Sequence, residues 1–209
     1  MQIHLRDLSK ALVDAWAREF ANVPSVTVSC GDIFSNAPGL VEPDAAIDVT
    51  ADAIVSPANS FGFMDGGIDA VYTYHFGEGL QQRLQEVIAV EHGGELPVGA
   101  AVVVPTMHAD IPWCISAPTM RVPRDVATTV NAYLAFRAAL RAILAHNASG
   151  RLSAIRSVLC PGLGTAVGRM PAARCARQMR AAWERVLGGQ GTMPRSLRAA
   201  TDDEHDLLS

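Results

Sequence analysis

The sequence predicts an α/β protein built around a central, mostly parallel β-sheet. Short apolar segments of strand length alternate along the chain with longer segments in which apolar residues recur at helical spacing. This alternation favours helices packed on a mostly parallel sheet. The segment 51–56 is short and apolar, which is typical of a strand that is covered on both faces.

The predicted strands and helices alternate along most of the chain. Strands are expected at residues 2–6, 26–30, 51–56, 98–105, 113–118 and 155–160. Helices are expected at residues 8–20, 69–76, 80–90, 125–146 and 171–187. Several boundaries carry local signals: Pro24 follows the first helix, Gly93 and Gly150 close two others, and Pro171 suits a first helical turn.

The chain is expected to form a single domain over residues 1–187. It shows no internal repeat, and no Pro/Gly-rich linker separates two cores. Residues 35–50 are rich in turn formers and are expected to form a surface connection. Residues 188–209 turn polar and acidic, which predicts a frayed, flexible C-terminal tail.

Composition excludes several classes of function. Of the 209 residues, 49% are hydrophobic and 18% are charged, as in a soluble globular protein. The net charge of −4 and a pI near 5.8 give no electrostatic signal for nucleic acid. The N-terminus lacks the pattern of a signal peptide, and no apolar run reaches the length of a membrane span. We therefore expect a cytoplasmic protein without a membrane partner.

The cysteines do not indicate a metal centre. Cys30, Cys114, Cys160 and Cys175 are scattered, with no C-x-x-C motif and no histidine at ligand spacing. Buried free thiols are the expected outcome. We expect no metal site and no disulfide framework.

Two glycine-rich loops directly follow predicted strands, at residues 59–67 and 161–168. Ligands of such sheets bind at the carboxyl ends of the strands, so both loops are expected to face one crevice. In the second loop, Gly162, Gly164 and Gly168 allow backbone amides to converge before a helix, an arrangement that holds phosphate. The alternative is an ordinary strand-to-helix turn. The loop is not a P-loop, and the absence of a following βαβ unit argues against a dinucleotide fingerprint.

The first loop combines backbone N–H groups with the side-chain amide of an asparagine and the carboxylate of an aspartate. Gly66, Gly67 and Ile68 can present adjacent N–H groups, and Asp69 opens the next predicted helix. Asp69 can also be a helix-capping residue, and Asn59 a turn residue. Local chemistry leaves both readings of this loop open.

Four motifs in order resemble the macro domain family. They are G-D-I at 31–33, D-A-I-V-S-P-A-N-S at 52–60, D-G-G-I-D at 65–69 and P-G-L-G-T-A-V-G at 161–168. The resemblance extends over roughly residues 26–187. It implies a three-layer α/β/α sandwich with a mixed, mostly parallel sheet and a cleft for ADP-ribose.

The resemblance also implies roles for individual residues. Asp32 would accept a hydrogen bond from the adenine amine with the Ile33 backbone nearby, although a strand-end turn would equally explain Asp32. Asn59 would bind the distal ribose. The diphosphate would lie between two walls formed by Gly66, Gly67 and Ile68 on one side and by Gly162, Gly164, Thr165, Ala166, Val167 and Gly168 on the other.

Asp69 favours an enzyme over a binding module but does not by itself prove catalysis. In the hydrolytic branches of the family an aspartate follows the glycine-rich stretch and orients or activates water. The resemblance thus implies hydrolysis of an ADP-ribosyl linkage or of ADP-ribose 1″-phosphate, with ADP-ribose or a mono-ADP-ribosylated macromolecule as partner and no required cofactor. The alternatives are a non-catalytic reader of ADP-ribose or adenine nucleotides and a structural protein without a ligand.

The chain departs from the family pattern at three places, one of which is the segment P-T-M-R-V-P-R-D at 118–125. Ser56 and Pro57 stand where the family has Asn and Ala, and Arg169 and Met170 stand where an aromatic residue often stacks on the ligand. Phe61, Phe63 and Tyr72 are alternative sources of stacking, although a core position is expected for each. Arg121 and Arg124 can reach a phosphate or a protein substrate, but solvated loop charges are the expected reading.

Overall fold

The computed structural model describes residues 1–35, 49–191 and 193–209. Its strands are β1 (Gln2–Asp7), β2 (Val26–Cys30), β3 (Ala53–Ser56), β4 (Val102–Pro105), β5 (Trp113–Ser116) and β6 (Ser157–Cys160). Its helices are α1 (Lys10–Glu19), α2 (Gly67–Phe76), α3 (Gly79–His92), α4 (Asn131–Ser149), α5 (Ala172–Val186) and α6 (Leu197–Leu208). Most of the expected segments from residue 2 to residue 187 therefore exist, with shifted ends.

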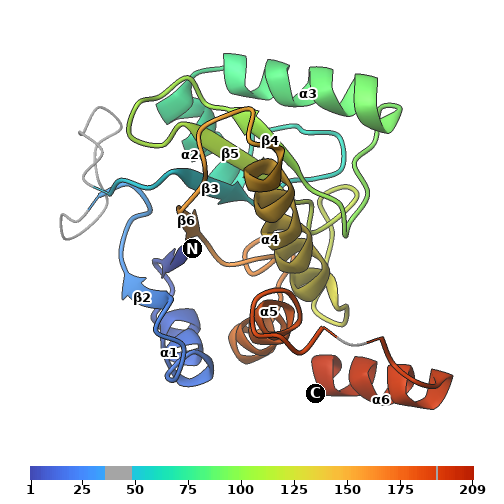
Figure 1. Ribbon diagram of the computed structural model, residues 1–209. Coiled ribbons are helices and arrows are strands. Elements are labelled where there is room, and N and C mark those ends of the chain that lie inside the picture. Colours follow the sequence, from blue (N-terminus) through green and yellow to red (C-terminus); the bar gives the residue numbers. More distant parts are fainter. Residues whose placement is uncertain (36–48, 192) are drawn as a thin grey trace.

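The strands form one mixed sheet in the order β2-β1-β6-β3-β5-β4. The pairs β1–β2, β1–β6, β3–β6 and β3–β5 are parallel, and β4 alone in this sheet runs antiparallel to its neighbour β5. In Figure 1 α2 and α3 lie on one side of the sheet, and α1 and α5 lie on the other. The prediction of a three-layer α/β/α fold with a mixed, mostly parallel sheet is confirmed.

The strands β3, β4, β5 and β6 contribute to two separate hydrophobic cores. Ala53 and Val55 of β3 pack with α1, α4 and α5, whereas Ile54 between them packs with α2 and α3. The same alternation separates Val158 from Leu159 in β6. Successive side chains of a strand point to opposite faces, so a sheet covered on both sides needs apolar residues at every position.

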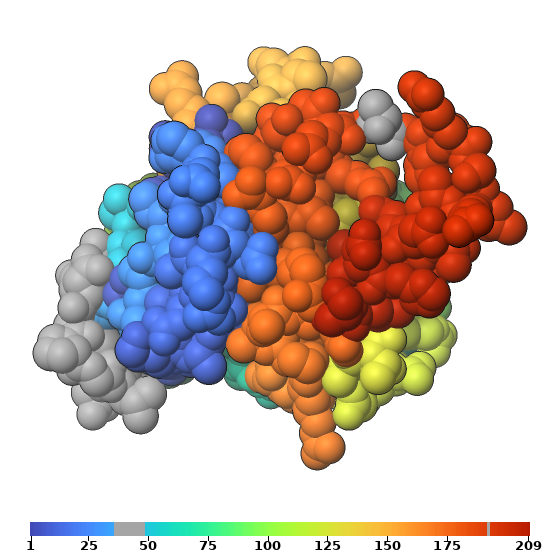
Figure 2. Space-filling view, turned by 90° about the horizontal axis from the view of Figure 1, so that it is seen from below, coloured from blue at the N-terminus to red at the C-terminus, as the bar shows by residue number. Residues whose placement is uncertain are grey.

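The helices of one face pack against each other as well as against the sheet. Figure 2 shows α1 and α5 side by side on this face, with α6 next to α5. Within α1, the side chain of Ser9 accepts a hydrogen bond from the Leu12 amide and caps the helix. Among the described residues, no helix has the length and apolar content needed to cross a membrane.

The predicted helix at 125–146 begins later than expected. Residues 125–130 form a turn in which Asp125 accepts a hydrogen bond from the Ala127 amide. The amide of Val126 donates to the Gly168 carbonyl at 2.8 Å, and the Val126 side chain is buried. This contact with a distant loop, which periodicity cannot reveal, holds the chain out of helical conformation before Asn131.

The C-terminal segment contains a helix that the sequence analysis did not predict. Ser196 caps α6, and Leu207 is buried against the rest of the molecule. Arg185 of α5 pairs with Asp203 of α6. The flexibility of residues 188–209 stays a prediction, and the expected surface connection at 35–50 lies largely outside the described residues.

The buried side chain of Gln178 ties three segments of this face together. Its amide oxygen accepts from the Tyr133 backbone at 3.1 Å, at the start of α4. Its amide nitrogen donates to the carbonyls of Thr129 at 2.8 Å and Leu207 at 3.0 Å. Gln178 thus satisfies backbone groups of α4, of the turn before it and of α6.

Replacing Gln178 by Ala should destabilise the protein by about 2–4 kcal/mol, because it leaves buried backbone groups without partners and opens a cavity. Denaturant unfolding measures this change in the free energy of unfolding. The matched control is Gln190→Ala, which truncates an exposed glutamine and should stay within about 0.5 kcal/mol of the wild type. Equal stability of the two variants would contradict the role of Gln178.

Candidate functional site

A cleft of about 210 Å³ lies at the carboxyl ends of the parallel strands. Its walls come from the segment after β3, the segment after β5 and the loop after β6. The two glycine-rich loops that the sequence analysis expected in one crevice are therefore brought together. The predicted residues that line the cleft are Asn59, Gly66, Gly67, Ile68, Asp69, Gly162, Gly164, Thr165, Ala166, Val167 and Gly168.

The N-terminus of α2 forms one wall. Gly66 is the N-cap residue and has extended backbone, while Gly67 has φ +58°, a conformation that favours glycine. The first amides of a helix have no acceptor within the helix, and the helix dipole adds partial positive charge there. This wall therefore offers neutral hydrogen-bond donors to an anion.

Asp69 lies in the first turn of α2, and its side chain does not cap the helix. Its carboxylate accepts a hydrogen bond from the Ser56 hydroxyl at 2.6 Å, and both side chains are buried. Burial raises the pKa of Asp69 to about 6, and the hydrogen bond from Ser56 opposes this shift. Asp69 is thus a first-turn residue of α2, as the alternative reading allowed, but its side chain makes no capping hydrogen bond.

Ser56 is one of the departures from the family pattern, and in the structure its side chain has a hydrogen-bond partner. It ends β3 and is fully buried. The serine hydroxyl reaches the carboxylate of Asp69 directly. Next to it, the Tyr72 hydroxyl donates to the Val55 carbonyl at 3.0 Å, which confirms a core position for Tyr72.

The loop after β6 forms the opposite wall and is held by its own backbone. The Met170 amide donates to the Gly164 carbonyl at 2.9 Å, and Gly164 has φ +71°. A Cβ atom on Gly168 would lie 2.5 Å from the Gly164 carbonyl oxygen, so no other residue fits there. Among the described residues, nothing accepts from the amides of Thr165, Ala166 and Val167.

Sequence reasoning missed Asp7, which also lines the cleft. It ends β1, and its carboxylate accepts from the Gly162 amide at 3.0 Å and from the Ser9 amide at 2.8 Å. Asp7 therefore joins the carboxyl end of β1 to the loop after β6. An acidic residue immediately after the predicted strand 2–6 was the available signal.

The segment after β5 was also missed as part of the site. Thr119, Met120 and Pro123 line the cleft. The Thr119 hydroxyl donates to the Pro57 carbonyl at 3.0 Å, which fastens this segment to the loop after β3. Arg121 pairs with Glu95 at 2.7 Å in an exposed position. This agrees with the prediction that Arg121 is a solvated loop charge.

Asn59 lines the cleft, but the loop itself uses its side chain. The side-chain oxygen accepts from the amides of Phe61 at 3.1 Å and Phe63 at 3.3 Å. The side-chain nitrogen donates to the Phe63 carbonyl at 2.8 Å. These bonds match the turn alternative for Asn59, and its contact with a ribose stays a prediction.

Asp32 and Ile33 do not line the cleft. The Asp32 carboxylate accepts from the Phe34 amide at 2.9 Å, which is the bond of a strand-end turn. Ile33 is buried in the core on the side of α2 and α3. Their contact with adenine stays a prediction.

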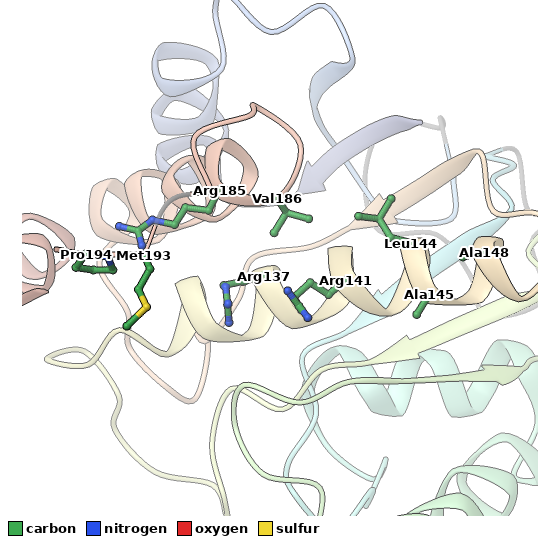
Figure 3. A pocket seen from close by; sticks show the side chains of 10 residues that line it. Arg137, Arg141, Leu144, Ala145, Ala148, Arg185, Val186, Met193 and Pro194 are labelled. Atoms are coloured by element: carbon green, nitrogen blue, oxygen red, sulfur yellow. The ribbon is translucent and has the colours of Figure 1, made fainter.

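A larger cavity of about 740 Å³ lies elsewhere, between α4, the end of α5 and the residues Gly191, Met193 and Pro194. Figure 3 shows Arg137 and Arg141 on α4 and Arg185 on α5 in its wall, with Leu144, Val186 and Met193. None of the predicted site residues lines this cavity. The chemistry expected from the sequence therefore belongs to the smaller cleft at the strand ends.

Fold and cleft together define an α/β/α protein with a strand-end cleft between two glycine-rich loops. The family model of the macro domain matches residues 55–179, more than half of the chain, and covers both glycine-rich loops. The chain belongs to the macro domain family.

Two relatives are similar in sequence. An uncharacterized protein of Aquifex aeolicus is 37% identical over 132 residues, 63% of this chain and 72% of its own length. An uncharacterized protein of Aeropyrum pernix is 33% identical over 146 residues, 66% of this chain and 70% of its own length.

Solved macrodomains share the fold. The macrodomain of Mycobacterium tuberculosis DarG has a TM-score of 0.57 at 21% identity and covers 76% of this chain and 90% of its own. The Oceanobacillus iheyensis macrodomain with MES bound has a TM-score of 0.50 at 22% identity, covering 76% of this chain and 84% of its own. At these identities the likeness shows the fold.

The burial of Asp69 has a consequence for stability. The folded state holds the proton of Asp69 more tightly than the unfolded chain, because the pKa rises from 3.8 to about 6. Ionisation therefore costs folding free energy as the pH rises through this window. Relative to Asp69→Asn, the unfolding free energy of the wild type should fall by on the order of 3 kcal/mol between about pH 4 and pH 6.5, then stay level.

Denaturant unfolding of both proteins across this pH range measures the difference. Asp14→Asn is the control, because it removes an exposed carboxylate of α1 and should show no such trend. A difference between wild type and Asp69→Asn that does not vary with pH would contradict the burial of a charged Asp69.

Proposed function

We propose that the cleft binds ADP-ribose or an ADP-ribosyl group and that the protein hydrolyses the linkage at the distal ribose. The observation that carries this proposal is the convergence of two amide-rich loops on one cleft that contains the buried carboxylate of Asp69. Membership of the macro domain family supports ADP-ribose as the ligand.

Neutral amides are the groups available for the diphosphate. The N-terminus of α2 lies on one side of the cleft and the amides of residues 165–167 on the other. The cleft also contains the carboxylates of Asp7, Asp65 and Asp69. Asp7 is engaged with backbone amides and Asp69 with Ser56, so their charge is partly offset before a phosphate enters.

Asp69 is the proposed general base. A water molecule attacks the anomeric carbon of the distal ribose, Asp69 takes a proton from that water, and the bond from the carbon to the target atom breaks. The leaving group takes up a proton, which gives free ADP-ribose and the unmodified target. A carboxyl group with a pKa near 6 is mostly ionised at neutral pH and basic enough to accept this proton.

One observation favours the alternative of a reader module. Asp69 is 7% exposed, and the Ser56 hydroxyl already bonds its carboxylate. A carboxylate that is buried and already hydrogen-bonded can hold α2 against β3 without contacting water or substrate. The reader binds ADP-ribose and turns nothing over.

Asp69→Ala separates the two functions. For an enzyme, turnover should fall by about 10²–10⁴-fold, because general-base catalysis is lost, while ADP-ribose affinity stays within about threefold. The substrates are mono-ADP-ribosylated protein and ADP-ribose 1″-phosphate, with calorimetry for affinity. Asp14→Asn is the control.

Each alternative has its own outcome in this experiment. Wild-type protein that binds ADP-ribose and turns over neither substrate is a reader. Wild-type protein that binds neither ADP-ribose nor ADP contradicts the proposed function altogether.

Gly66→Ala tests how closely the ligand approaches α2. The backbone of Gly66 is extended, and an added Cβ meets no atom within 4 Å, so the fold tolerates the methyl group. In the complex the methyl group should keep the diphosphate from the α2 amides and lower the affinity for ADP-ribose about tenfold or more. Calorimetry measures the affinity, and an unchanged melting temperature confirms the fold. Unchanged affinity would place the diphosphate elsewhere.

A further inference from the structure

Phe63 is a half-exposed aromatic residue that lines the cleft. It is 52% exposed and lines the cleft, so the expectation of a core position for it is wrong. Of the other aromatic residues considered, Tyr72 is in the core and Phe61 packs against the Arg121 guanidinium at 4.9 Å. Phe63 is therefore the one of the three whose ring is available to a ligand.

Side-chain hydrogen bonds hold the backbone at Phe63 and at the next residue in place. Asn59 bonds both the amide and the carbonyl of Phe63. The next residue, Met64, is buried, and its amide donates to Gln81 at 2.6 Å while its carbonyl accepts from Thr73 at 2.7 Å. Because these hydrogen bonds fix the backbone of Phe63 and of Met64, the ring of Phe63 is held at the cleft. The ring itself contributes little to folding.

The opposite wall lacks an aromatic ring. Val167 is the exposed apolar side chain there, at 57%. Arg169 and Met170, which stand at the family's aromatic position, do not line the cleft, and Met170 is buried. Stacking in this cleft can therefore come from the loop after β3.

The strand order indicates which part of a ligand Phe63 can meet. The predicted adenine contact, Asp32, follows β2, and Phe63 follows β3, which is three strands away in the order β2-β1-β6-β3. Neighbouring strands lie roughly 4.8 Å apart, so the carboxyl ends of β2 and β3 are separated by about 14 Å along the edge of the sheet. With adenine near the end of β2 and the diphosphate between the loops, the distal ribose would fall on the side of β3, where Phe63 lines the cleft.

We propose that Phe63 is a specificity-determining residue whose ring packs on the apolar face of the distal ribose, and that Asn59 acts as a positioning residue for Phe63 instead of binding the sugar. The proposal rests on the proposed function, because it needs ADP-ribose in the cleft. Phe63 replaces the stacking ring that the loop after β6 lacks. Its ring therefore favours the binding of a ligand that carries a sugar beyond the diphosphate.

Calorimetry with ADP-ribose and with ADP tests the role of Phe63. Phe63→Ala should weaken ADP-ribose binding about tenfold and leave ADP binding unchanged, because only ADP-ribose carries the distal sugar. Phe63→Tyr keeps the ring and should restore the preference. The exposed ring contributes little to folding, so both variants should keep the wild-type melting temperature.

The outcomes distinguish this proposal from the proposed function. A wild type that prefers ADP-ribose together with a Phe63→Ala variant that keeps the same preference overturns the role of Phe63 alone. Equal losses for ADP-ribose and ADP also overturn it, since they would place the ring against the shared part of the ligands. A wild type that does not bind ADP-ribose overturns the proposed function.

A double-mutant cycle tests the role of Asn59. If Asn59 acts through Phe63, Asn59→Ala combined with Phe63→Ala should lose no more ADP-ribose affinity than Phe63→Ala alone. Additive losses would show that Asn59 contacts the ligand and would overturn the positioning role. If Asn59→Ala does not fold, Asn59→Ser serves in the cycle, because its hydroxyl can still accept from the loop amides.

Discussion

The position of β6 between β1 and β3 is the constraint on which the cleft depends. Parallel pairing on both sides aligns the carboxyl ends of the three strands at one edge of the sheet. The loop after β6 therefore meets the loop after β3, although they are far apart in the sequence. The hydrogen bond from the Gly162 amide to Asp7 then fastens the loop after β6 to the end of β1.

Asp69 shows how the site and the stability of the fold are connected. Burying a carboxylate is unfavourable unless hydrogen bonds compensate, and Ser56 supplies one such bond from the end of the neighbouring strand. The departure from Asn to Ser at this position thus coincides with a direct contact to the one buried acidic side chain among the residues lining the cleft. The chain retains a group that costs folding free energy at neutral pH, which is typical of functional sites.

Much of the fold could be predicted from the sequence because its signals are local. Apolar strands, helical periodicity and glycines with special backbone conformations gave the sheet, five helices and both loops of the cleft. The start of α4 could not be predicted, since it depends on the contact of Val126 with Gly168. The contribution of Asp7 likewise depends on a pairing between distant segments. The backbone of Phe63 is instead held by a local hydrogen bond from Asn59.

The central claim is that the ligand lies in the strand-end cleft between the two amide-rich walls, and not in the larger arginine-lined cavity. Amide NMR spectra recorded during titration with ADP-ribose test this claim most directly. The account predicts shifts at residues 66–69 and 164–168, with Arg137, Arg141 and Met193 unaffected. Shifts that centre on Arg141 and Met193, with the amides of both loops unchanged, would contradict it.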